Sequence, residues 1–545
     1  MLIQRDLNPS NILSWLCASL VFIPLLALVA EAFLIGDAYA SLDDIPSNVL
    51  LTYIANSIGV TLIAVVTALM VAVLPAWWCS RYEFKGRIFL TILMVLPLAI
   101  PAYINGYILT EWLDFAGPIQ TTLREWFGWQ SAQDYWVLDI RNVWGAGVVL
   151  GLALYPYLFL LAYNAFRQLP ESLASAAATL GASSSRIFWL VQLPMIRPAI
   201  AVGCTLVAME ALADFGTVQL FAVSTLTTAV YDTWLVYGSL ASAAKIAVLT
   251  LIIVLMIVVF ERYSRRRQQF FAAKSYQGKS RRTEASVMLQ TSIWVSCLIV
   301  IAIGFVLPVI HLIHYLIDYW QQNIESEQWQ YLLQTLELAG MATVITIIMA
   351  LLVNFSLRTK PSLQSRCLVN ISSLGYAVPG TVLAIGVLIP LTELDKWVNR
   401  WYHSLTDERL GLLFSGSIFA LVLAYSIRFA VISIGQVSSA YQQMPTNIDE
   451  AAMTLGASRW RTWTQIQLPM LKPALLSAFV LVFIECIKEL PASLLLRPFD
   501  FETLATYVYQ HASDEQLEIG ALSALMIIIL SLIPVIFVSK KMEQL

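Results

Sequence analysis

Long apolar runs separated by short polar segments recur along the whole chain. An α-helix needs about 20 apolar residues to cross the hydrocarbon core of a bilayer, and lipid leaves a spanning segment few other ways to satisfy its backbone. We predict twelve transmembrane helices, at about 12–34, 54–78, 88–110, 143–165, 198–221, 244–261, 290–317, 333–356, 367–391, 411–435, 474–496 and 519–538. The expected fold is therefore an all-α polytopic membrane protein.

One polar segment occurs twice. Residues 170–199 and 445–474 align without a gap at a shift of 275 positions, and fifteen of the thirty residues are identical. Each copy predicts an Ala-rich helix, a helix stop at Gly181 or Gly456, a polar-aromatic stretch, and a new helix starting at Pro198 or Pro473. We interpret both copies as docking loops, because ordinary connectors have no reason to match in register.

The repeat divides the chain into two halves of six predicted spans each. We expect an N-terminal half at 1–262, a basic linker at 263–289 and a C-terminal half at 290–545. Because six is an even number, the halves point the same way and are related by a pseudo-twofold axis along the membrane normal. Shorter echoes support this fusion: Asn56-Ser57 with Gln334-Thr335, Ile100-Pro101-Ala102 with Val378-Pro379-Gly380, and residues 225–228 with 503–506.

Composition and charge add an orientation to this picture. The 545 residues are 59% hydrophobic and only 12% charged. Most Lys and Arg residues lie on the side that holds the repeated loops, the linker and both termini, whereas acidic residues gather in the loops of the opposite side. Basic loops are typically cytoplasmic, so we place both repeated loops and both termini in the cytoplasm. The six cysteines show no disulfide framework and no metal-ligand spacing.

The linker contains a pattern that could be mistaken for a nucleotide site. Residues 273–280 fit a loose phosphate-loop pattern, but Ala273 stands where the stricter form needs Gly, and no strand feeds the loop. We therefore expect no catalytic residue and no cofactor in this chain. Nothing in the sequence suggests a nucleic-acid partner, whereas the apolar runs make the lipid bilayer an expected one.

The second repeated loop matches a known pattern: Glu-Ala-Ala, three residues, Gly, nine residues, then Ile-x-Leu-Pro. This resembles the cytoplasmic EAA loop of ABC importer permeases. The first loop carries Ser175 in place of the Glu, and Glu171 lies one helical turn earlier. In that family the loop forms the coupling helix that sits in a groove of the ATP-binding subunit. The expected docking residues are Ser175, Ala176, Ala177, Gly181, Glu450, Ala451, Ala452 and Gly456.

The resemblance covers nearly the whole chain, as two fused permease halves. It implies the type I ABC importer permease fold in a bacterial cytoplasmic (inner) membrane. It also implies two ATP-binding cassette subunits, which bind ATP and Mg, and a periplasmic or extracellular substrate-binding protein.

Residues 210–217 and 488–498 look like the corresponding stretches of fused ferric iron permeases. The resemblance therefore implies a ferric iron importer. A permease for thiamine or another small solute is the alternative. An ion-driven secondary transporter is less favoured, because such a carrier has no use for a duplicated docking loop.

Four acidic residues lie within predicted spans at matching positions of the two halves. At the shift of 275, Glu210 corresponds to Glu485 and Asp214 to Glu489. Charges at this depth are costly and normally face a pathway or a partner, and carboxylate oxygen suits a hard trivalent cation. All four are candidate translocation-pathway residues. The alternative is structural, with Lys488 pairing with its acidic neighbours to seal a helix interface or hinge.

Two further features have less specific interpretations. His311 and His314 lie three residues apart in the seventh span, and we expect them to be packed rather than to bind a metal. The outer loops 112–140 and 392–410 are rich in Trp and Tyr. Aromatic belts at the membrane surface explain them best, with a docking surface for an outside partner as the alternative.

Overall fold

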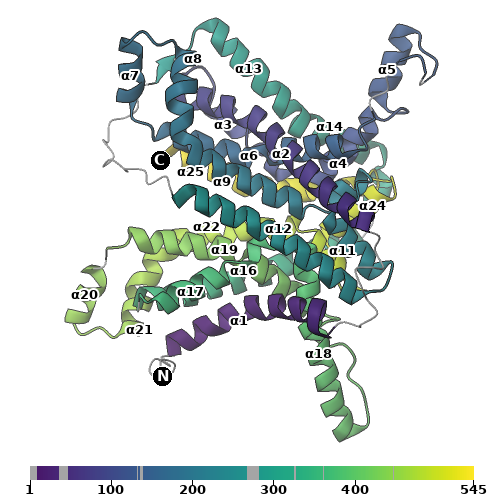
Figure 1. Cartoon of the computed structure of the whole chain (residues 1–545), viewed down its shortest axis with the longest axis vertical. Helices are drawn as coiled ribbons and strands as arrows, with labels where there is room; N and C mark the ends of the chain where they lie inside the picture. The colour runs from purple at the N-terminus through teal and green to yellow at the C-terminus, as the bar shows by residue number, and fades with distance from the viewer. Residues whose placement is uncertain are drawn as a thin grey trace. The chain divides into compact units, whose positions relative to one another are not determined.

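The computed structural model describes residues 9–35, 47–131, 133–135, 139–266, 282–324, 327–359, 361–445 and 447–544. These residues are almost entirely helical (Figure 1). The one sheet among them is a parallel pair, Tyr82–Glu83 (β1) with Thr283–Glu284 (β2). Most of the predicted linker, 267–281, lies outside the described residues, and so does the phosphate-loop-like segment 273–280.

The chain forms two compact units. Unit 1 comprises residues 1–44, 230–251 and 326–506, and unit 2 comprises 45–229, 252–325 and 507–545. These units do not coincide with the predicted halves. The opening segment and a later segment of each half, 1–44 with 230–251 and 290–325 with 507–545, belong to the unit that contains most of the other half. Tertiary packing decides such an exchange, and a sequence repeat carries no signal of it. The division of the repeat at 263–289 stays a prediction.

The described helices of unit 1 are α1 (Pro9–Ala30), η1 (Glu31–Ile35), α16 (Glu327–Thr359), α17 (Leu363–Ser372), η6 (Gly375–Ala377), α18 (Gly380–Thr406), α19 (Ile418–Gln443), α20 (Asn447–Thr454), α21 (Arg459–Thr462), η7 (Trp463–Gln467), α22 (Leu468–Lys488) and α23 (Pro491–Leu496). Three helices are divided between the units: α11 (Leu226–Leu235), α12 (Leu240–Arg266) and α24 (Leu504–Ser513).

The described helices that lie wholly in unit 2 are α2 (Ser47–Arg81), α3 (Arg87–Leu93), η3 (Leu96–Ala99), α4 (Ala102–Leu113), α5 (Pro118–Phe127), α6 (Val143–Arg167), α7 (Glu171–Thr179), α8 (Ser184–Ile187), η4 (Phe188–Gln192), α9 (Leu193–Ala213), α10 (Gly216–Leu220), α13 (Val287–Ile301), η5 (Ala302–Val306), α14 (Leu307–Asp318), α15 (Trp320–Asn323) and α25 (Ala521–Gln544).

All twelve predicted spans have helical counterparts. Nine helices within the described ranges are long and apolar enough to cross a membrane, and two bent helix pairs raise the number to eleven. The last predicted span corresponds to a shorter apolar helix, Ala521–Ile536. The all-α polytopic fold is therefore confirmed.

The two bent pairs explain one of the sequence echoes. Arg87–Ala99 and Ala102–Phe127 meet at 90°, and Leu363–Ala377 and Gly380–Thr406 meet at 116°. Pro101 and Pro379 stand at the two breaks, directly before α4 and α18. Proline lacks the N–H that would continue the preceding helix, so it starts a new one. The predicted spans 88–110 and 367–391 are thus broken rather than straight.

Small residues bring the main helices of unit 2 close together. Ala64, Ala68, Ala72 and Ala76 recur every fourth residue along one face of α2, and all four are fully buried. Opposite them on α6, a Cβ atom added to Gly151 would lie 2.8 Å from the carbonyl oxygen of Ala64. Without a hydrophobic driving force between helices in lipid, such close backbone packing is a main source of helix association.

Candidate functional site

The two repeated loops have the same structure, one in each unit. α7 in unit 2 and α20 in unit 1 are each followed by the predicted glycine, then by a short helix, a π-helical turn and a long apolar helix. Ser183 and Ser458 cap the short helices, because each hydroxyl accepts the N–H of the residue three positions later, at 3.4 and 3.3 Å. The repeat in sequence is therefore a repeat in local structure.

Gly181 and Gly456 end the helices α7 and α20, as predicted. Their φ angles are +83° and +84°, which glycine adopts without the steric cost of a Cβ atom. In each loop the glycine N–H and the next N–H bond back to the carbonyls three and five residues earlier, at 2.9–3.0 Å. These two backbone hydrogen bonds together form the Schellman motif, which ends a helix. A Cβ atom at either glycine would meet nothing within 4 Å, so backbone conformation alone requires the glycine.

The structure corrects the predicted start of the following helix. Pro198 and Pro473 lie inside α9 and α22, whereas Pro194 and Pro469 occupy the first turn. The polar-aromatic stretch before them is itself helical, so the continuous helical spans are Ser184–Ala213 and Arg459–Lys488. This continuity was not predicted from the sequence. A π-helical turn, Phe188–Gln192 or Trp463–Gln467, joins each short helix to the Leu-Pro pair that follows.

The predicted docking residues are mostly accessible. Ser175, Ala176, Gly181, Glu450, Ala451 and Gly456 are exposed, Ala177 is half-buried, and Ala452 is buried. The residues just before the two glycines are large and apolar, and Leu180 and Leu455 are 88% and 89% exposed. Each loop therefore presents a short helix that ends in an exposed leucine. Docking at these residues stays a prediction.

The four acidic candidates fall into two pairs, one in each unit. Glu210 lies within α9, and Asp214 follows the last residue of that helix; Glu485 lies within α22, and Glu489 follows its last residue. The sequence predicts that Asp214 and Glu489 lie within spans. The structure places them instead at the point where each apolar helix ends. The predicted arrangement of all four around one axis stays a prediction.

Asp214 caps the helix that follows its break. Its two oxygens accept the backbone N–H groups of Thr217 and Val218 at 3.0 and 3.1 Å and the Thr217 hydroxyl at 3.0 Å. These donors start α10 (Gly216–Leu220). The donors are neutral, so they orient the carboxylate without cancelling its charge.

Glu489 has the same position but a cationic partner. Its Oε1 atom accepts the N–H of Ala492, which starts α23. Its Oε2 atom lies 3.1 Å from Nε of Arg428, and both side chains are less than a tenth exposed. Arg428 was missed from the sequence, although a lone arginine inside the apolar run 411–435 is a signal that could have identified it.

Lys488 pairs with a different acid. Its Nζ atom lies 3.4 Å from Oε1 of Glu485, three residues earlier on α22. The structural interpretation thus describes Glu485 and Glu489 well, since each faces a cation within unit 1.

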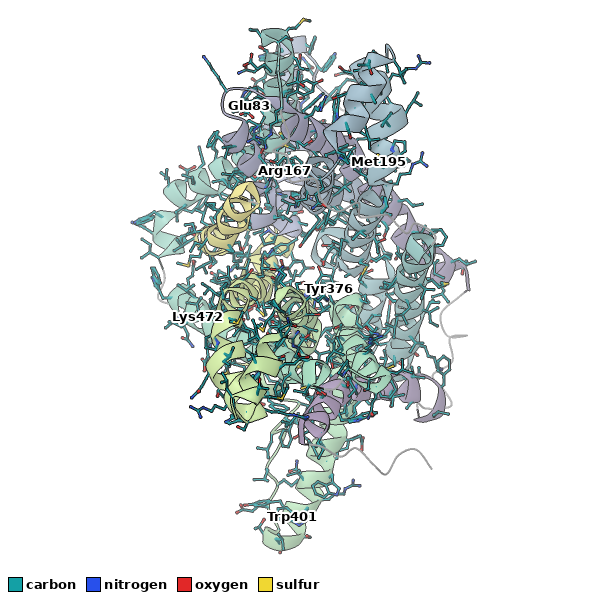
Figure 2. All side chains as sticks on the ribbon, turned by 90° about the vertical axis from the view of Figure 1, so that its left-hand side faces the viewer. Glu83, Arg167, Met195, Tyr376, Trp401 and Lys472 are labelled. Atoms are coloured by element: carbon teal, nitrogen blue, oxygen red, sulfur yellow. The ribbon has the colours of Figure 1, made fainter. Side chains whose placement is uncertain are left out.

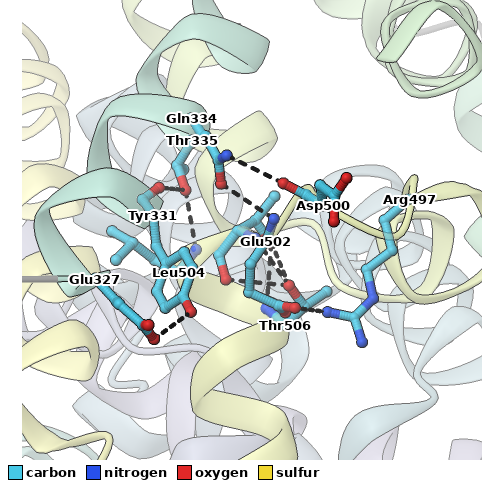
Figure 3. A network of polar contacts seen from close by, with 10 residues as sticks. Glu327, Tyr331, Gln334, Thr335, Arg497, Asp500, Glu502, Leu504 and Thr506 are labelled. Atoms are coloured by element: carbon cyan, nitrogen blue, oxygen red, sulfur yellow. Dashed lines mark hydrogen bonds and ion pairs between the residues drawn. The ribbon is translucent and has the colours of Figure 1, made fainter. Parts of the chain in front are cut away.

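The sequence echoes identify contacts that both halves make. In unit 2, the Ser57 hydroxyl accepts the N–H of Leu226 at 2.9 Å. In unit 1, the Thr335 hydroxyl accepts the N–H of Leu504, also at 2.9 Å. Figure 3 shows the second contact, together with Gln334, whose side chain accepts the N–H of Glu502 at 3.1 Å. Each echo therefore ties the start of a long span to the loop that follows the helix break.

The two histidines of α14 differ from each other. The Trp112 indole donates to Nδ1 of His311 at 3.2 Å, so Nε2 carries the ring proton and faces Glu111 at 3.2 Å. A metal-bound histidine normally donates from its second nitrogen, whereas Nδ1 of His311 accepts. His311 is thus packed as expected, but His314 is not, since its side chain is 71% exposed beside Asp318. Within the described ranges, no three His, Cys, Asp or Glu side chains could hold a metal ion together.

Both aromatic segments on the predicted outer side form helical arms. α5 stands out from the rest of unit 2 (Figure 1), and the end of α18, which carries Trp401, stands out from unit 1 (Figure 2). Trp126 is 77% exposed on α5, and Trp397 and Trp401 are 59% and 57% exposed on α18. Both interpretations of these arms, an aromatic belt and a docking surface for an outside partner, stay predictions.

Comparison with known proteins gives a family and several relatives. The family described as binding-protein-dependent transport system inner membrane component matches the chain twice, at 64–269 and 342–541. The Fe(3+)-transport system permease protein FbpB 2 of Haemophilus influenzae is 25% identical over 505 residues, which are 91% of this chain and 89% of that protein. The ferric transport system permease protein FbpB of Actinobacillus pleuropneumoniae is 23% identical over 541 residues, or 94% of this chain and 75% of that protein.

A shorter relative matches only part of the chain. The molybdenum transport system permease protein ModB of Escherichia coli is 27% identical over 214 residues, which are 38% of this chain but 90% of that protein. A relative of this size is comparable to one half of the chain. Because the two family matches together cover more than half of the sequence, the protein belongs to the family of binding-protein-dependent transport system inner membrane components and is a multi-pass membrane protein with two copies of the family domain in one chain.

Proposed function

We propose that this chain is the transmembrane permease subunit of a binding-protein-dependent ABC importer for ferric iron. The duplicated loop carries the proposal: two exposed helices, α7 and α20, each stopped by a glycine with positive φ and each leading into a long apolar helix. Each loop docks one ATP-binding cassette subunit in the cytoplasm. The leucine exposed at each stop supplies apolar area, and Glu450 adds a charge in the second loop.

The substrate assignment rests on two supports. Relatives that span nearly all of this chain are named for ferric or Fe(3+) transport. Carboxylates also stand at or near both helix breaks, and carboxylate oxygen is a suitable ligand for a hard cation. The hydrogen-bond donors to Asp214 are neutral, whereas Glu489 faces Arg428 and Glu485 faces Lys488. We therefore assign Asp214, with Glu210 one turn before it, to the cation pathway.

The same proposal assigns the remaining parts of the importer. The chain lies in the bacterial inner membrane with both termini in the cytoplasm. ATP and Mg bind to the partner subunits, and a soluble binding protein delivers the substrate from outside. ATP hydrolysis on the partner subunits moves the two loops. The loops in turn move the long apolar helices, Ser184–Ala213 and Arg459–Lys488, that begin in them.

Reconstitution tests the proposal. The purified chain is combined with candidate ATP-binding cassette subunits from the same organism, and both association and ATP hydrolysis are measured in lipid nanodiscs. We expect a complex with two ATPase subunits whose hydrolysis is stimulated by the loaded binding protein. Uptake that proceeds without the ATPase subunits and collapses with a protonophore would contradict it, because a secondary transporter behaves in that way.

A further inference from the structure

The second repeated loop is fastened to the long helices of unit 1 by a ring of polar contacts. Arg358, in the last turn of α16, lies 2.8 Å from Oδ2 of Asp449 on α20. The other oxygen of Asp449 accepts Nε2 of Gln467 at 2.8 Å. The carbonyl oxygen of Gln467's side chain accepts the Tyr441 hydroxyl at 3.2 Å. Tyr441 belongs to α19 and Gln467 precedes α22, so the ring joins four helices.

Arg358 also holds the chain that enters the loop. Its guanidinium donates to the backbone carbonyls of Tyr441, Met444 and Pro445 at 3.3, 3.2 and 3.1 Å. The side chains of Arg358 and Asp449 are 13% and 20% exposed. A planar guanidinium presents several donors in fixed directions, which suits it to fix two segments at once. The start of α20 therefore cannot shift relative to α16 without breaking these bonds.

Neighbouring acids of α20 have different surroundings. Asp449 faces Arg358 and Gln467, whereas Glu450 is exposed. Successive residues of a helix point about 100° apart, so one faces the bundle and the next faces outward. A force applied at Glu450 is thus passed to α16 through the ion pair between the neighbouring Asp449 and Arg358.

The first repeated loop lacks this ring. At the shift of 275, Asp449 corresponds to Ala174, Tyr441 to Phe166, and Gln467 to Gln192. Gln192 accepts a bond from the Trp77 indole at 2.6 Å. The rest of the contact is aromatic: the Phe188 ring lies 4.8 Å from that of Trp77 and 6.2 Å from that of Phe166. The second loop has an equivalent ring contact, Phe355 with Trp463 at 5.6 Å between ring centroids. The ion pair of Asp449 is therefore an addition to the second loop that the first, with Ala174 at that position, does not repeat.

We infer that Arg358 is a positioning residue for energy coupling, and that the second loop transmits the ATP-driven movement more directly than the first. This inference rests on the proposed docking of ATPase subunits. Two separate differences between the loops agree with it. Only the second loop carries the motif glutamate, Glu450, and the acidic residue that pairs with Arg358, Asp449, is replaced by Ala174 in the first loop.

The test compares variants in the complete complex with its ATPase subunits. Substrate transported per ATP hydrolysed is measured for Arg358→Gln, Asp449→Asn and Arg358→Lys. The matched control is Trp77→Phe, which removes the hydrogen bond from Trp77 to Gln192 and keeps the aromatic packing. A spin label on α20 at Met453, and one on α7 at the corresponding Ala178, report the mobility of each loop.

We expect Arg358→Gln to lower the transport-to-hydrolysis ratio about tenfold, a size typical of coupling between sites, and to raise label mobility at Met453 but not at Ala178. Arg358→Lys keeps the positive charge and should recover part of the ratio. Trp77→Phe should change the ratio less than twofold. Reduced abundance alone does not change a ratio, so a merely structural role predicts normal coupling in the complexes that form.

Two results have separate meanings. If the unmodified chain forms no complex with ATPase subunits, the proposed function fails and this inference fails with it. If the unmodified complex couples normally and Arg358→Gln leaves both the ratio and the Met453 label unchanged, the inference is overturned while the proposed function stands.

Discussion

Replacing Glu489 with Gln should destabilise the protein far more than replacing Asp214 with Asn. Both residues end an apolar helix and cap the next one, at equivalent positions of the repeat. Only Glu489 forms an ion pair, with Arg428 at 3.1 Å. Its surroundings are also tight, since a Cβ atom at Gly380 would lie 2.5 Å from Oε1 of Glu489. The change to Gln removes the negative charge that the buried guanidinium of Arg428 faces at 3.1 Å.

The free energy of unfolding lost in each variant follows from these contacts. Removing one partner of a buried ion pair costs about 3–5 kcal/mol, a large part of the roughly 5–15 kcal/mol that holds a typical protein folded. Gln keeps an oxygen that accepts the N–H of Ala492, so the cap itself survives. At Asp214 the donors are neutral and Asn retains one acceptor oxygen, so the expected loss is about 1 kcal/mol.

The assay measures the unfolding temperature of purified protein in detergent and its abundance in membranes. Glu489→Gln should unfold at a clearly lower temperature than Asp214→Asn. Adding Arg428→Met to Glu489→Gln should restore much of the loss, because it removes the buried positive charge as well. An unfolding temperature for Glu489→Gln equal to that of the unmodified protein, or to that of Asp214→Asn, would refute the reasoning.

Four further predictions address the pathway, the loops and the orientation. Asp214→Asn should sharply reduce ferric iron uptake at normal abundance, and unchanged uptake would remove Asp214 from the pathway. Gly456→Val forces a side chain into a left-handed backbone at a cost of about 1–2 kcal/mol; it should uncouple ATP hydrolysis from transport, and normal coupling would show that the helix stop is dispensable. Glu450→Ala should weaken ATPase binding in a pull-down, whereas an equal loss in Ser175→Ala would contradict the role of the charge. Cysteine at the exposed position Trp460 should react with an impermeant maleimide only in inside-out vesicles, and labelling of intact cells would reverse the topology.

The sequence predicts the local features of this fold well. Apolar run length identifies the long spans, because crossing lipid requires about 20 apolar residues, whereas the last predicted span corresponds to the shorter helix Ala521–Ile536. The stops at Gly181 and Gly456 are predictable, since a positive φ strongly favours glycine. The echo Asn56-Ser57 and its partners identify residues that make equivalent contacts in both halves.

Other features need the tertiary structure. The breaks at Pro101 and Pro379 are visible as prolines within apolar runs, but proline in a membrane helix can also be tolerated without a break. The partner of Glu489 lies 61 residues away on α19, and no short-range pattern connects the two. The exchange of opening helices between the units depends on long-range packing, which periodicity does not encode.

Within the candidate site, the sequence identifies the repeated loops but not how they are held. Asp449 precedes the motif glutamate and looks like one more exposed acid of a surface helix. Its contact with Arg358 joins residues 91 positions apart, and the repeat gives no hint of it, because Ala174 occupies the corresponding position. The difference in how the two repeated loops are held could therefore be seen only in the structure.

The most direct test of the central claim is transport by the complete complex in proteoliposomes, with ferric iron, thiamine, phosphate and a polyamine offered in parallel together with the binding protein. The account predicts ATP-dependent accumulation of ferric iron and none of the other three. Accumulation of thiamine, phosphate or polyamine in place of ferric iron, or ferric iron uptake that does not depend on ATP, would contradict it.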